Sequence, residues 1–430
     1  MYTYRIEGGF PIKGSIRASG NKNAALPCIA ATLLTREPVV LRNLPDIEDV
    51  LVMLEIVEHL GVKAERGEEH GSWILQAEEI AETTIPLELS KRIRASILLA
   101  GPLLARAGEV VLPPPGGDVI GRRRLDTHFI ALEALGARVE TDGVFEISAN
   151  KLIGVEIFLD EASVTATENA IMASVLAEGT TRIENAASEP HIQDLCRLLN
   201  RMGAHISGIG SNILTIEGVD ALSGADYAIG ADYMEVGSFI GLAAVTHGEL
   251  TIENAGAQHL KMVKLAFGKL GIHWERRGQD IFVPSNQSLR VVSDMGGMIP
   301  KIDDAPWPGF PPDLTSIITV VATQVEGAIL IHEKMFESRM FFVDKLIGMG
   351  ARIVLCDPHR AVVSGPARLT GSELVSPDVR AGMAMVIAAL CAQGESLIQN
   401  VYQIERGYED LTKRLRSLGA QIERIDVPGS

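Results

Sequence analysis

Cysteine, aromatic residues and long apolar runs are all scarce in this sequence of 430 residues. Its four cysteines lie far apart and form no CxxC pair, which argues against a disulfide framework and against a zinc site. No apolar run approaches the ~20 residues that span a bilayer, and the first residues lack the basic-then-apolar order of a signal peptide. We therefore expect a cytoplasmic protein that does not bind membranes and whose thiols are reduced and mostly buried.

Positive charge is also in short supply, since the formal net charge is −16. Binding to nucleic acid needs a cationic surface that displaces counterions, so no nucleic-acid partner is expected. An acidic protein still binds an anionic metabolite if its basic residues gather in one cleft. With 47% hydrophobic residues the chain has enough apolar side chain for large cores, and its length predicts two or three domains.

A repeat of roughly 70 residues sets the expected architecture. Six times, a helix-like stretch ends in Leu-Gly or Met-Gly and runs into an alternating strand, with glycines at Gly61, Gly136, Gly203, Gly271, Gly350 and Gly419. Each glycine suits the position after a helix, where a left-handed backbone is needed. A second strand-like element precedes each helix, in three clear copies (Gly179–Asn185, Gly248–Asn254, Gly394–Asn400) and three looser ones (residues 37–43, 108–113 and 327–332). The pattern predicts an α/β protein with two domains of three repeats, although repeats alone fit a passive scaffold equally well.

Four segments carry candidate chemistry; the first two are weak when taken alone, and the third, with its arginine run, points more strongly to an anionic ligand. Lys22 follows a glycine turn and leads into an apolar helix, where a helix N-terminus would face an anion. Arg94 belongs to the basic turn Ser90–Ser96. A Pro/Gly-rich stretch that reads as a mobile surface loop runs from residue 113 to Asp118, and three consecutive arginines follow it at 122–124. Their forked donors match phosphate and carboxylate groups.

The last segment ends at Asp313, which follows a proline-stiffened stretch. A stiff backbone is one way to hold a general base, and the same residue could equally cap the apolar helix that starts at Leu314. Arg339 and Arg380 complete the set of basic candidates, and each would by itself be read as a surface residue.

In this order, the segments resemble the enolpyruvyl transferase family, and its MurA-type group, the UDP-N-acetylglucosamine 1-carboxyvinyltransferases, more closely than EPSP synthase. Residues 19–27 resemble the family's SGNKNAALP, 163–169 its SVGATEN, 232–237 its D-x-x-E-x-G, 310–313 its FPTD and 404–409 its IDRGYE. The resemblance covers essentially the whole chain. It implies a two-lobed inside-out α/β barrel of six βαβ-type repeats, with residues 1–20 plus 231–430 in one lobe, 21–230 in the other, and the active site between them.

The resemblance also implies a reaction and its residues. The enolpyruvyl group of phosphoenolpyruvate would pass to the 3′-hydroxyl of UDP-N-acetylglucosamine, the first committed step of peptidoglycan precursor synthesis, which supports cell-wall formation, cell shape and division. No cofactor or metal is required, and the protein would be a monomer or weak homo-oligomer. Asp118 would be the general acid and Asp313 the general base, with Lys22 also catalytic. Phosphoenolpyruvate would be bound by Lys22, Asn23, Arg94, Arg123, Arg339 and Arg380. The UDP-sugar would contact Asn23, Arg123, Arg124, Leu125, Asp126, Ser163, Val164, Thr165, Asp313 and Met335.

Three departures from the family pattern leave alternatives open. Asp118 stands where most relatives have a cysteine that the antibiotic fosfomycin alkylates, so we expect an active enzyme that is insensitive to it. Arg124 replaces a proline and Thr165 replaces a glycine near the expected nucleotide contacts. These changes leave room for a different UDP-sugar or nucleotide as acceptor. A non-catalytic regulator that binds a sugar nucleotide is a further alternative, which the presence of both Asp118 and Asp313 disfavours.

Overall fold

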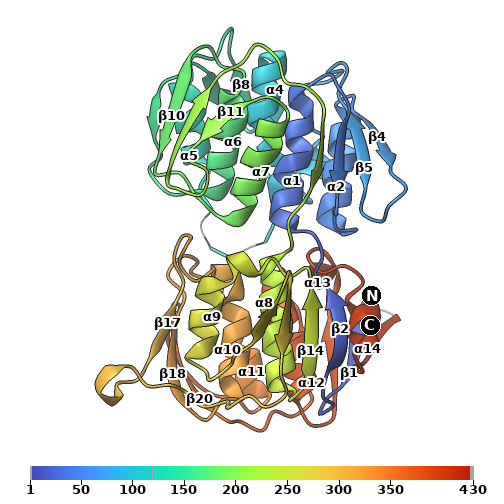
Figure 1. The fold of residues 1–430 in the computed structure, drawn as a ribbon, viewed down its shortest axis with the longest axis vertical. Coiled ribbons are helices and arrows are strands. Elements are labelled where there is room, and N and C mark those ends of the chain that lie inside the picture. Colours follow the sequence, from blue (N-terminus) through green and yellow to red (C-terminus); the bar gives the residue numbers. More distant parts are fainter. Residues whose placement is uncertain (1, 119, 122, 427–430) are drawn as a thin grey trace. The chain divides into compact units, whose positions relative to one another are not determined.

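The computed structural model describes residues 2–118, 120–121 and 123–426, which form two compact units (Figure 1). Unit 1 consists of Met1–Ser19, Val119–Arg122 and Ala231–Ser430, and unit 2 of Gly20–Asp118 and Arg123–Gly230. The chain therefore leaves unit 1 after its first strands, returns to it with Ile120 and Gly121, and enters it finally at Ala231.

In the described part of the chain, unit 2 contains three small sheets. The first has the order β13 (Ala225–Ala228), β3 (Val39–Arg42), β5 (Trp73–Gln76), β4 (Lys63–Arg66). The second is β6 (Glu109–Leu112), β8 (Phe145–Ser148), β7 (Arg138–Thr141), with Thr84 forming a parallel bridge to Val111 at its edge. The third is β11 (His205–Ser207), β12 (Ile213–Glu217), β10 (Thr180–Glu184), β9 (Glu156–Phe158).

Unit 1 repeats this plan with three sheets of four strands each among its described residues. Their orders are β15 (Glu275–Arg277), β16 (Asp280–Val283), β14 (Glu249–Glu253), β2 (Lys13–Arg17); β17 (Lys301–Asp303), β18 (Gly327–His332), β20 (Arg360–Gly365), β19 (Arg352–Asp357); and β21 (Glu373–Val375), β22 (Glu395–Gln399), β1 (Tyr2–Glu7), β23 (Gln421–Asp426). In the last sheet the N-terminal strand β1 lies between β22 and β23, and in the first sheet of unit 2 the late strand β13 is the edge strand beside β3.

Five of the six described sheets contain one parallel strand pair, and in three of them, β9/β10, β17/β18 and β21/β22, the two strands are consecutive in the chain with a helix between them. The helices of unit 2 are α1 (Lys22–Ala31), α2 (Glu48–His59), α3 (Leu87–Ser90), α4 (Ala100–Ala107), α5 (Asp126–Ala134), α6 (Val164–Ser174) and α7 (Pro190–Arg201). Those of unit 1 are α8 (Tyr233–Val245), α9 (Lys261–Gly268), α10 (Thr315–Thr323), α11 (Val343–Gly348), α12 (Val379–Cys391), α13 (Tyr402–Glu405) and α14 (Leu411–Ser417). No helix in the described residues is both long and apolar enough to cross a membrane.

Helices fill the interior of each unit while the sheets lie outside them (Figure 1). Every residue of α8 and α10 is buried, and so is all of α12 except Cys391. A helix that is apolar on all sides is stable only when it is surrounded by protein, which explains the long runs of Ala, Val, Ile and Gly in these three segments. Their N-termini carry Asp232, Asp313 and Asp378, so the core helices present polar groups where they begin.

The sequence signals that defined the repeat have clear structural causes. All six predicted helix-terminating glycines have a positive φ, between 70° for Gly271 and 106° for Gly61, which confirms the left-handed position. Asn43, Asn185 and Asn400 end the second strand element and also have a positive φ. Each donates its side-chain amide to the carbonyl just beyond the neighbouring parallel strand, at Ile229, Leu159 and Ser376 respectively. Each of these asparagines therefore stabilises the pairing of the two parallel strands in its sheet.

Candidate active site

Asp313 lies in a short 3-10 helix, η5 (Pro312–Leu314), that leads into α10. Its Oδ1 accepts a hydrogen bond from Arg339 Nη2 and its Oδ2 one from Arg380 Nε, each at 2.9 Å. Both arginine side chains are almost fully buried, whereas the Asp313 side chain keeps 23% of its surface exposed. The arrangement is therefore an accessible carboxylate held from behind by two guanidinium groups, which a ligand can reach.

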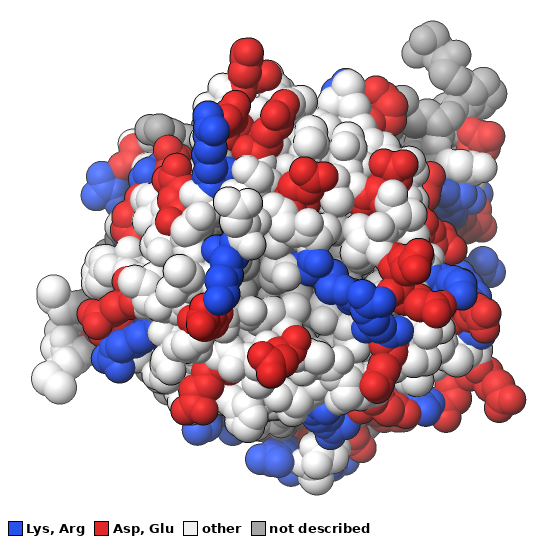
Figure 2. Space-filling model, turned by 90° about the horizontal axis from the view of Figure 1, so that it is seen from above, with Lys and Arg blue, Asp and Glu red and all other residues white. Residues whose placement is uncertain are grey.

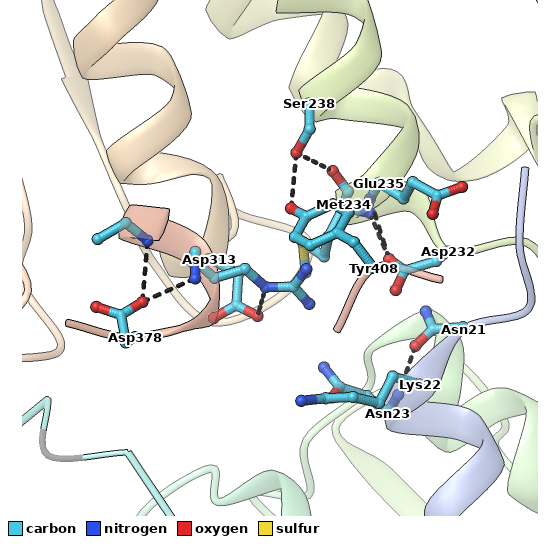
Figure 3. Close-up of polar contacts among 12 residues, drawn as sticks. Asn21, Lys22, Asn23, Asp232, Met234, Glu235, Ser238, Asp313, Asp378 and Tyr408 are labelled. Atoms are coloured by element: carbon cyan, nitrogen blue, oxygen red, sulfur yellow. Dashed lines mark hydrogen bonds and ion pairs between the residues drawn. The ribbon is translucent and has the colours of Figure 1, made fainter. Parts of the chain in front are cut away.

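Arg380 is fixed at the start of α12 by the elements around it. Asp378 caps this helix by accepting from the backbone N–H groups of Arg380 and Ala381 (Figure 3). The guanidinium lies 5.5 Å from the ring centroid of Tyr408, whose hydroxyl is 3.0 Å from Ser238 Oγ. Burial lowers the pKa of Arg380, but the acidic groups of Tyr408, Asp313 and Asp232 outweigh it and hold the pKa well above its ordinary value.

Arg339 belongs to a turn that two buried acids organise. Asp304 accepts hydrogen bonds from the backbone N–H groups of Lys334 and Met335, and Glu333 Oε1 accepts from Phe336 N–H at 3.2 Å. Glu333 Oε2 lies 4.0 Å from Arg339 Nε. Burial raises the pKa of Glu333 to about 8, with Asp304 adding to the rise and Arg339 opposing it. The turn thus positions Arg339 and leaves Met335 exposed.

In unit 2, Lys22 stands at the first position of α1. The helix is capped by Asn21, whose side chain accepts from the backbone N–H groups of Asn23 and Ala24 (Figure 3). Lys22 Nζ pairs with Asp49 Oδ2 at 2.8 Å, and the two side chains are only 12% and 6% exposed. Asp49 was not expected from the sequence, and it means that an anion bound by Lys22 would share the ammonium with a buried carboxylate.

Arg94 begins η2 (Arg94–Leu99) and contacts the loop that bears Asp118 and Arg123. Its Nη2 donates to the Arg123 carbonyl at 2.7 Å. Burial, followed by the charge of Arg123, lowers the pKa of Arg94 to about 10. The loop approaches so closely that a Cβ at Gly117 would lie 2.8 Å from the Arg94 Cβ. Asp118 itself is half-buried, while Arg122 of the arginine run lies outside the described residues.

The nucleotide candidates Arg124, Leu125 and Asp126 lie at the start of α5. Arg124 Nε pairs with Asp126 Oδ2 at 3.1 Å, and its Nη2 pairs with Asp160 Oδ2 at 3.0 Å. Asp160 also accepts from the Thr127 hydroxyl at 2.6 Å. Arg124, at the position where the resemblance predicts a proline, is therefore paired with two acidic residues of its own unit, Asp126 and Asp160.

Ser163, Val164 and Thr165 form the start of α6. Ser163 is the N-cap and accepts from Ala166 N–H at 3.4 Å. Thr165 Oγ1 lies 3.0 Å from His128 Nε2, and His128 Nδ1 lies 2.9 Å from Asn169 Nδ2. Burial, followed by the charge of Arg94, lowers the pKa of His128 to about 3, so the imidazole is neutral. The side chain of Thr165 is thereby bonded to its own unit.

The structure joins some predicted residues directly and leaves others apart. In unit 1, Asp313, Arg339 and Arg380 form one hydrogen-bonded cluster, and Met335 lies on the same turn as Arg339. In unit 2, the side chains of Lys22 and Arg94 make no hydrogen bond to each other among the described residues, although α1 packs against η2. The described residues contain no group of three or more His, Cys, Asp or Glu side chains that could hold a metal ion.

Several residues that shape these clusters were not predicted, namely Asp49, His128, Asn169, Asp304, Glu333 and Tyr408. Tyr408 lay within a quoted motif, and Asn169 within another, so their positions were visible but not their partners. Other residues of the quoted motifs, in 232–237 and 404–409, have structural roles. Asp232 caps α8, and Glu235 forms a buried ion pair with Arg414 at 2.8 Å. Gly407 leaves space for Val379, whose Cγ1 would lie 2.3 Å from a Cβ there.

Comparison with known proteins identifies relatives along the whole chain. The family model for EPSP synthase (3-phosphoshikimate 1-carboxyvinyltransferase) matches residues 6–415. Curated relatives named UDP-N-acetylglucosamine 1-carboxyvinyltransferase include one from Treponema denticola, 69% identical over 98% of this chain and 99% of its own. Another, from Treponema pallidum, is 67% identical over the same shares of the two chains. One from Borreliella burgdorferi is 58% identical over 99% of both.

Solved structures show the same fold at lower identity. The enolpyruvyl transferase NikO from Streptomyces tendae superposes with a TM-score of 0.87 at 23% identity over 99% of both chains. The EPSP synthase from Acinetobacter baumannii gives a TM-score of 0.76 at 19% identity, over 99% of this chain and all of the other. The predicted fold class, with six repeats of mixed sheet and helix, is thereby confirmed.

Proposed function

The chain belongs to the EPSP synthase family of enolpyruvyl transferases, and on this premise we propose that it transfers the enolpyruvyl group of phosphoenolpyruvate to UDP-N-acetylglucosamine with release of phosphate. This is the first committed step of peptidoglycan precursor synthesis. The observation that carries the proposal is the near-complete match to relatives that bear the name of this reaction. We also propose that the two compact units are the two lobes expected from the sequence, residues 1–20 plus 231–430 and residues 21–230.

Phosphoenolpyruvate carries about three negative charges at neutral pH, so several cations must bind it together. We assign this task to Lys22, Asn23, Arg94, Arg123, Arg339 and Arg380. The buried guanidinium groups of Arg339 and Arg380 support the assignment, because they are held rigidly and lose little conformational freedom on binding. Arg94 is charged at neutral pH despite its lowered pKa of about 10.

In the proposed reaction, Asp313 takes the proton from the 3′-hydroxyl as its oxygen attacks C2 of phosphoenolpyruvate. Asp118, protonated at that moment, delivers a proton to C3, which gives a tetrahedral adduct with a methyl group. Loss of one proton from that methyl group back to the acid and cleavage of the C2–O bond to phosphate then restore the double bond. Asp313 suits the role of base because both its oxygens are held by arginines while its side chain stays accessible.

The acceptor is assigned to unit 2 contacts at Arg123, Arg124, Leu125, Asp126, Ser163, Val164 and Thr165, together with Asn23, Asp313 and Met335. One observation favours considering another UDP-sugar or a nucleotide as acceptor: the Asp126 carboxylate is engaged by Arg124. A nucleotide that needs this carboxylate must displace the arginine, whereas one that contacts only backbone groups need not.

We further propose that the enzyme is insensitive to fosfomycin, because a carboxylate at position 118 attacks the epoxide far less readily than a thiolate. Wild-type protein incubated with the drug should gain no covalent mass and keep its activity. Asp118→Cys should gain one drug molecule by mass spectrometry and lose activity in proportion. A stoichiometric adduct on the wild-type protein would overturn this proposal.

The test of function is phosphate release from phosphoenolpyruvate with UDP-N-acetylglucosamine as acceptor. Wild type should release phosphate, and Asp313→Ala and Asp118→Ala should each lower kcat by about two to four orders of magnitude, the usual contribution of a positioned acid or base. If phosphate is released only with a different UDP-sugar or nucleotide, that compound and not UDP-N-acetylglucosamine is the acceptor. Binding of sugar nucleotide without any turnover would favour a regulator.

A further inference from the structure

The two arginines that hold Asp313 have donors that this carboxylate does not use. Arg339 donates from Nη2 to Oδ1, and Arg380 donates from Nε to Oδ2. The two guanidinium side chains are only 4% and 5% exposed, so little water reaches them. In the part of the chain that the structure describes, Arg339 Nε and Arg380 Nη1 are buried and have no hydrogen-bond partner. Buried donors without a partner are costly, and an anion that reaches them is bound favourably.

Positive charge is also in excess at this cluster, because two cations share the carboxylate of Asp313. Glu333 lies 4.0 Å from Arg339 Nε but keeps its proton at neutral pH, since burial raises its pKa to about 8. The charge of Asp232 raises the pKa of Arg380 less than the charge of Asp313 does. Asp313 is therefore the principal counterion of both arginines, and it leaves their positive charge only partly compensated.

An anion that binds to Arg339 and Arg380 must come close to Asp313. The Asp313 side chain is 23% exposed, so it lies on the side from which a ligand can approach the buried arginines. Two anions that share the same cations repel each other, and repulsion is strong where water is largely excluded. The hydrogen bonds that hold Asp313 in place also make it a poorer proton acceptor, because both donors are cationic.

We propose that Asp313 and phosphoenolpyruvate compete for Arg339 and Arg380, so that the carboxylate becomes an effective base only when the substrate has taken over its arginines. The inference rests on the proposed function, which supplies phosphoenolpyruvate as the anion and Asp313 as the base. A carboxylate that loses a cationic partner accepts a proton more readily. The coupling is reciprocal, so the free energy that weakens substrate binding is the same free energy that strengthens the base. Without substrate, Asp313 serves as the counterion of two buried cations.

The experiment measures the binding of phosphoenolpyruvate by calorimetry in the absence of an acceptor, so that no transfer takes place. Asp313→Asn removes the charge and keeps the shape, and its amide NH2 group cannot accept from an arginine. We expect it to bind phosphoenolpyruvate about tenfold more tightly than wild type, or tighter still. Asp313→Glu keeps the competing charge and should gain no affinity. Glu326→Gln removes one negative charge from an exposed ion pair with Arg290, and should change the affinity by less than about threefold.

Circular dichroism shows whether Asp313→Asn is folded, and a second measurement does not depend on that variant. Wild type labelled with 13C at its aspartate carboxyl groups gives one resonance that is missing from Asp313→Glu, and this resonance belongs to Asp313. We expect it to shift when phosphoenolpyruvate saturates the protein, because the guanidinium groups turn from the carboxylate toward the substrate. An unchanged resonance at saturation would contradict the competition.

The outcomes separate this inference from the proposed function. If wild type does not turn over UDP-N-acetylglucosamine but Asp313→Asn binds phosphoenolpyruvate more tightly, the proposed function fails and the competition for the arginines stands. If folded Asp313→Asn binds phosphoenolpyruvate no more tightly than wild type, or if Glu326→Gln gains as much affinity, the competition is wrong whatever the turnover. Phosphoenolpyruvate that binds to neither wild type nor Asp313→Asn would overturn the inference as well.

Discussion

Asp313 shows how a single side chain can be accessible and yet rigid. Its two oxygens accept hydrogen bonds from different arginines, one on the turn after β18 and one at the start of α12. Neither arginine can follow the carboxylate if it rotates, because both are packed inside unit 1. Removing the charge of Asp313 therefore leaves two buried cations with a poorer partner.

We expect Asp313→Asn to lower the free energy of unfolding by about 1–3 kcal/mol, since hydrogen bonds from charged donors to the carboxylate are weakened. Urea denaturation monitored by circular dichroism measures the change. Asp303→Asn is the matched control, because Asp303 pairs with Lys301 and Lys334 on a more exposed part of the same unit. There we expect a change of at most about 1 kcal/mol. Equal effects of the two substitutions would contradict the account of Asp313.

The residue types at the site could be predicted from the sequence, but their partners could not. Lys22, Arg94, Asp313, Arg339 and Arg380 stood out as basic or acidic groups beside turns. The residues that hold them are Asp49, Glu333 and Tyr408, which lie far from them in the chain or, like Glu333, look like ordinary charged surface residues. A pairing across 27 or more residues leaves no local pattern in one sequence, so only the folded chain reveals it.

At the scale of elements, the turn from Glu333 to Arg339 depends on a carboxyl group that retains its proton. Because the pKa of Glu333 is raised to about 8, the native state binds this proton more tightly than the unfolded chain does. Its contribution to stability is complete below the ordinary pKa of a glutamate. That contribution is lost as the pH rises toward 8.

We therefore expect Glu333→Gln to flatten the pH dependence of stability, because glutamine has no proton to lose. Wild type should lose free energy of unfolding between pH 5 and 8.5, and the variant should lose measurably less over the same range, in guanidinium titrations at each pH. Glu326→Gln, at an exposed ion pair with Arg290, serves as control and should keep the wild-type slope. A wild-type slope in the Glu333 variant would show that this carboxyl group does not titrate as described.

The glycines that follow the helices of the repeats allow a test of whether their left-handed backbone conformation requires glycine. Gly203 has a φ of 102°, and a Cβ there would meet nothing within 4 Å, so Gly203→Ala tests backbone conformation alone. We expect it to cost about 1–2 kcal/mol of stability. Gly268, the exposed last residue of α9, also has open space around it but no positive φ, and Gly268→Ala should be neutral or stabilise by up to about 1 kcal/mol. Changes of the same sign at both sites would contradict this reading.

At this scale the sequence was informative because each signal is local. A glycine after a helix, or an asparagine after a strand, determines the backbone at one position, and six copies of the pattern reinforce one another. What remained hidden was how three of the repeats are completed. Strand β1 lies between β22 and β23, β2 pairs with β14, and β13 pairs with β3, so each of these sheets joins strands from distant parts of the sequence.

The molecule as a whole has a net negative charge, although the residues proposed to bind phosphoenolpyruvate are mostly basic. Figure 2 shows acidic and basic side chains interspersed over one face, in keeping with many exposed ion pairs. The excess negative charge of −16 thus does not prevent arginines from being buried and paired where we propose that an anionic substrate binds. The family was recognisable from the sequence because its motifs recur in order along the whole chain.

The most direct test of the proposed reaction is proton and phosphorus NMR of wild-type protein with phosphoenolpyruvate and UDP-N-acetylglucosamine in D2O. An addition–elimination that protonates C3 predicts inorganic phosphate and an enolpyruvyl ether of the sugar nucleotide in equal amounts, with deuterium in the vinyl CH2 group of the product. Phosphate without the ether, or an ether whose vinyl group contains no deuterium, would contradict the account.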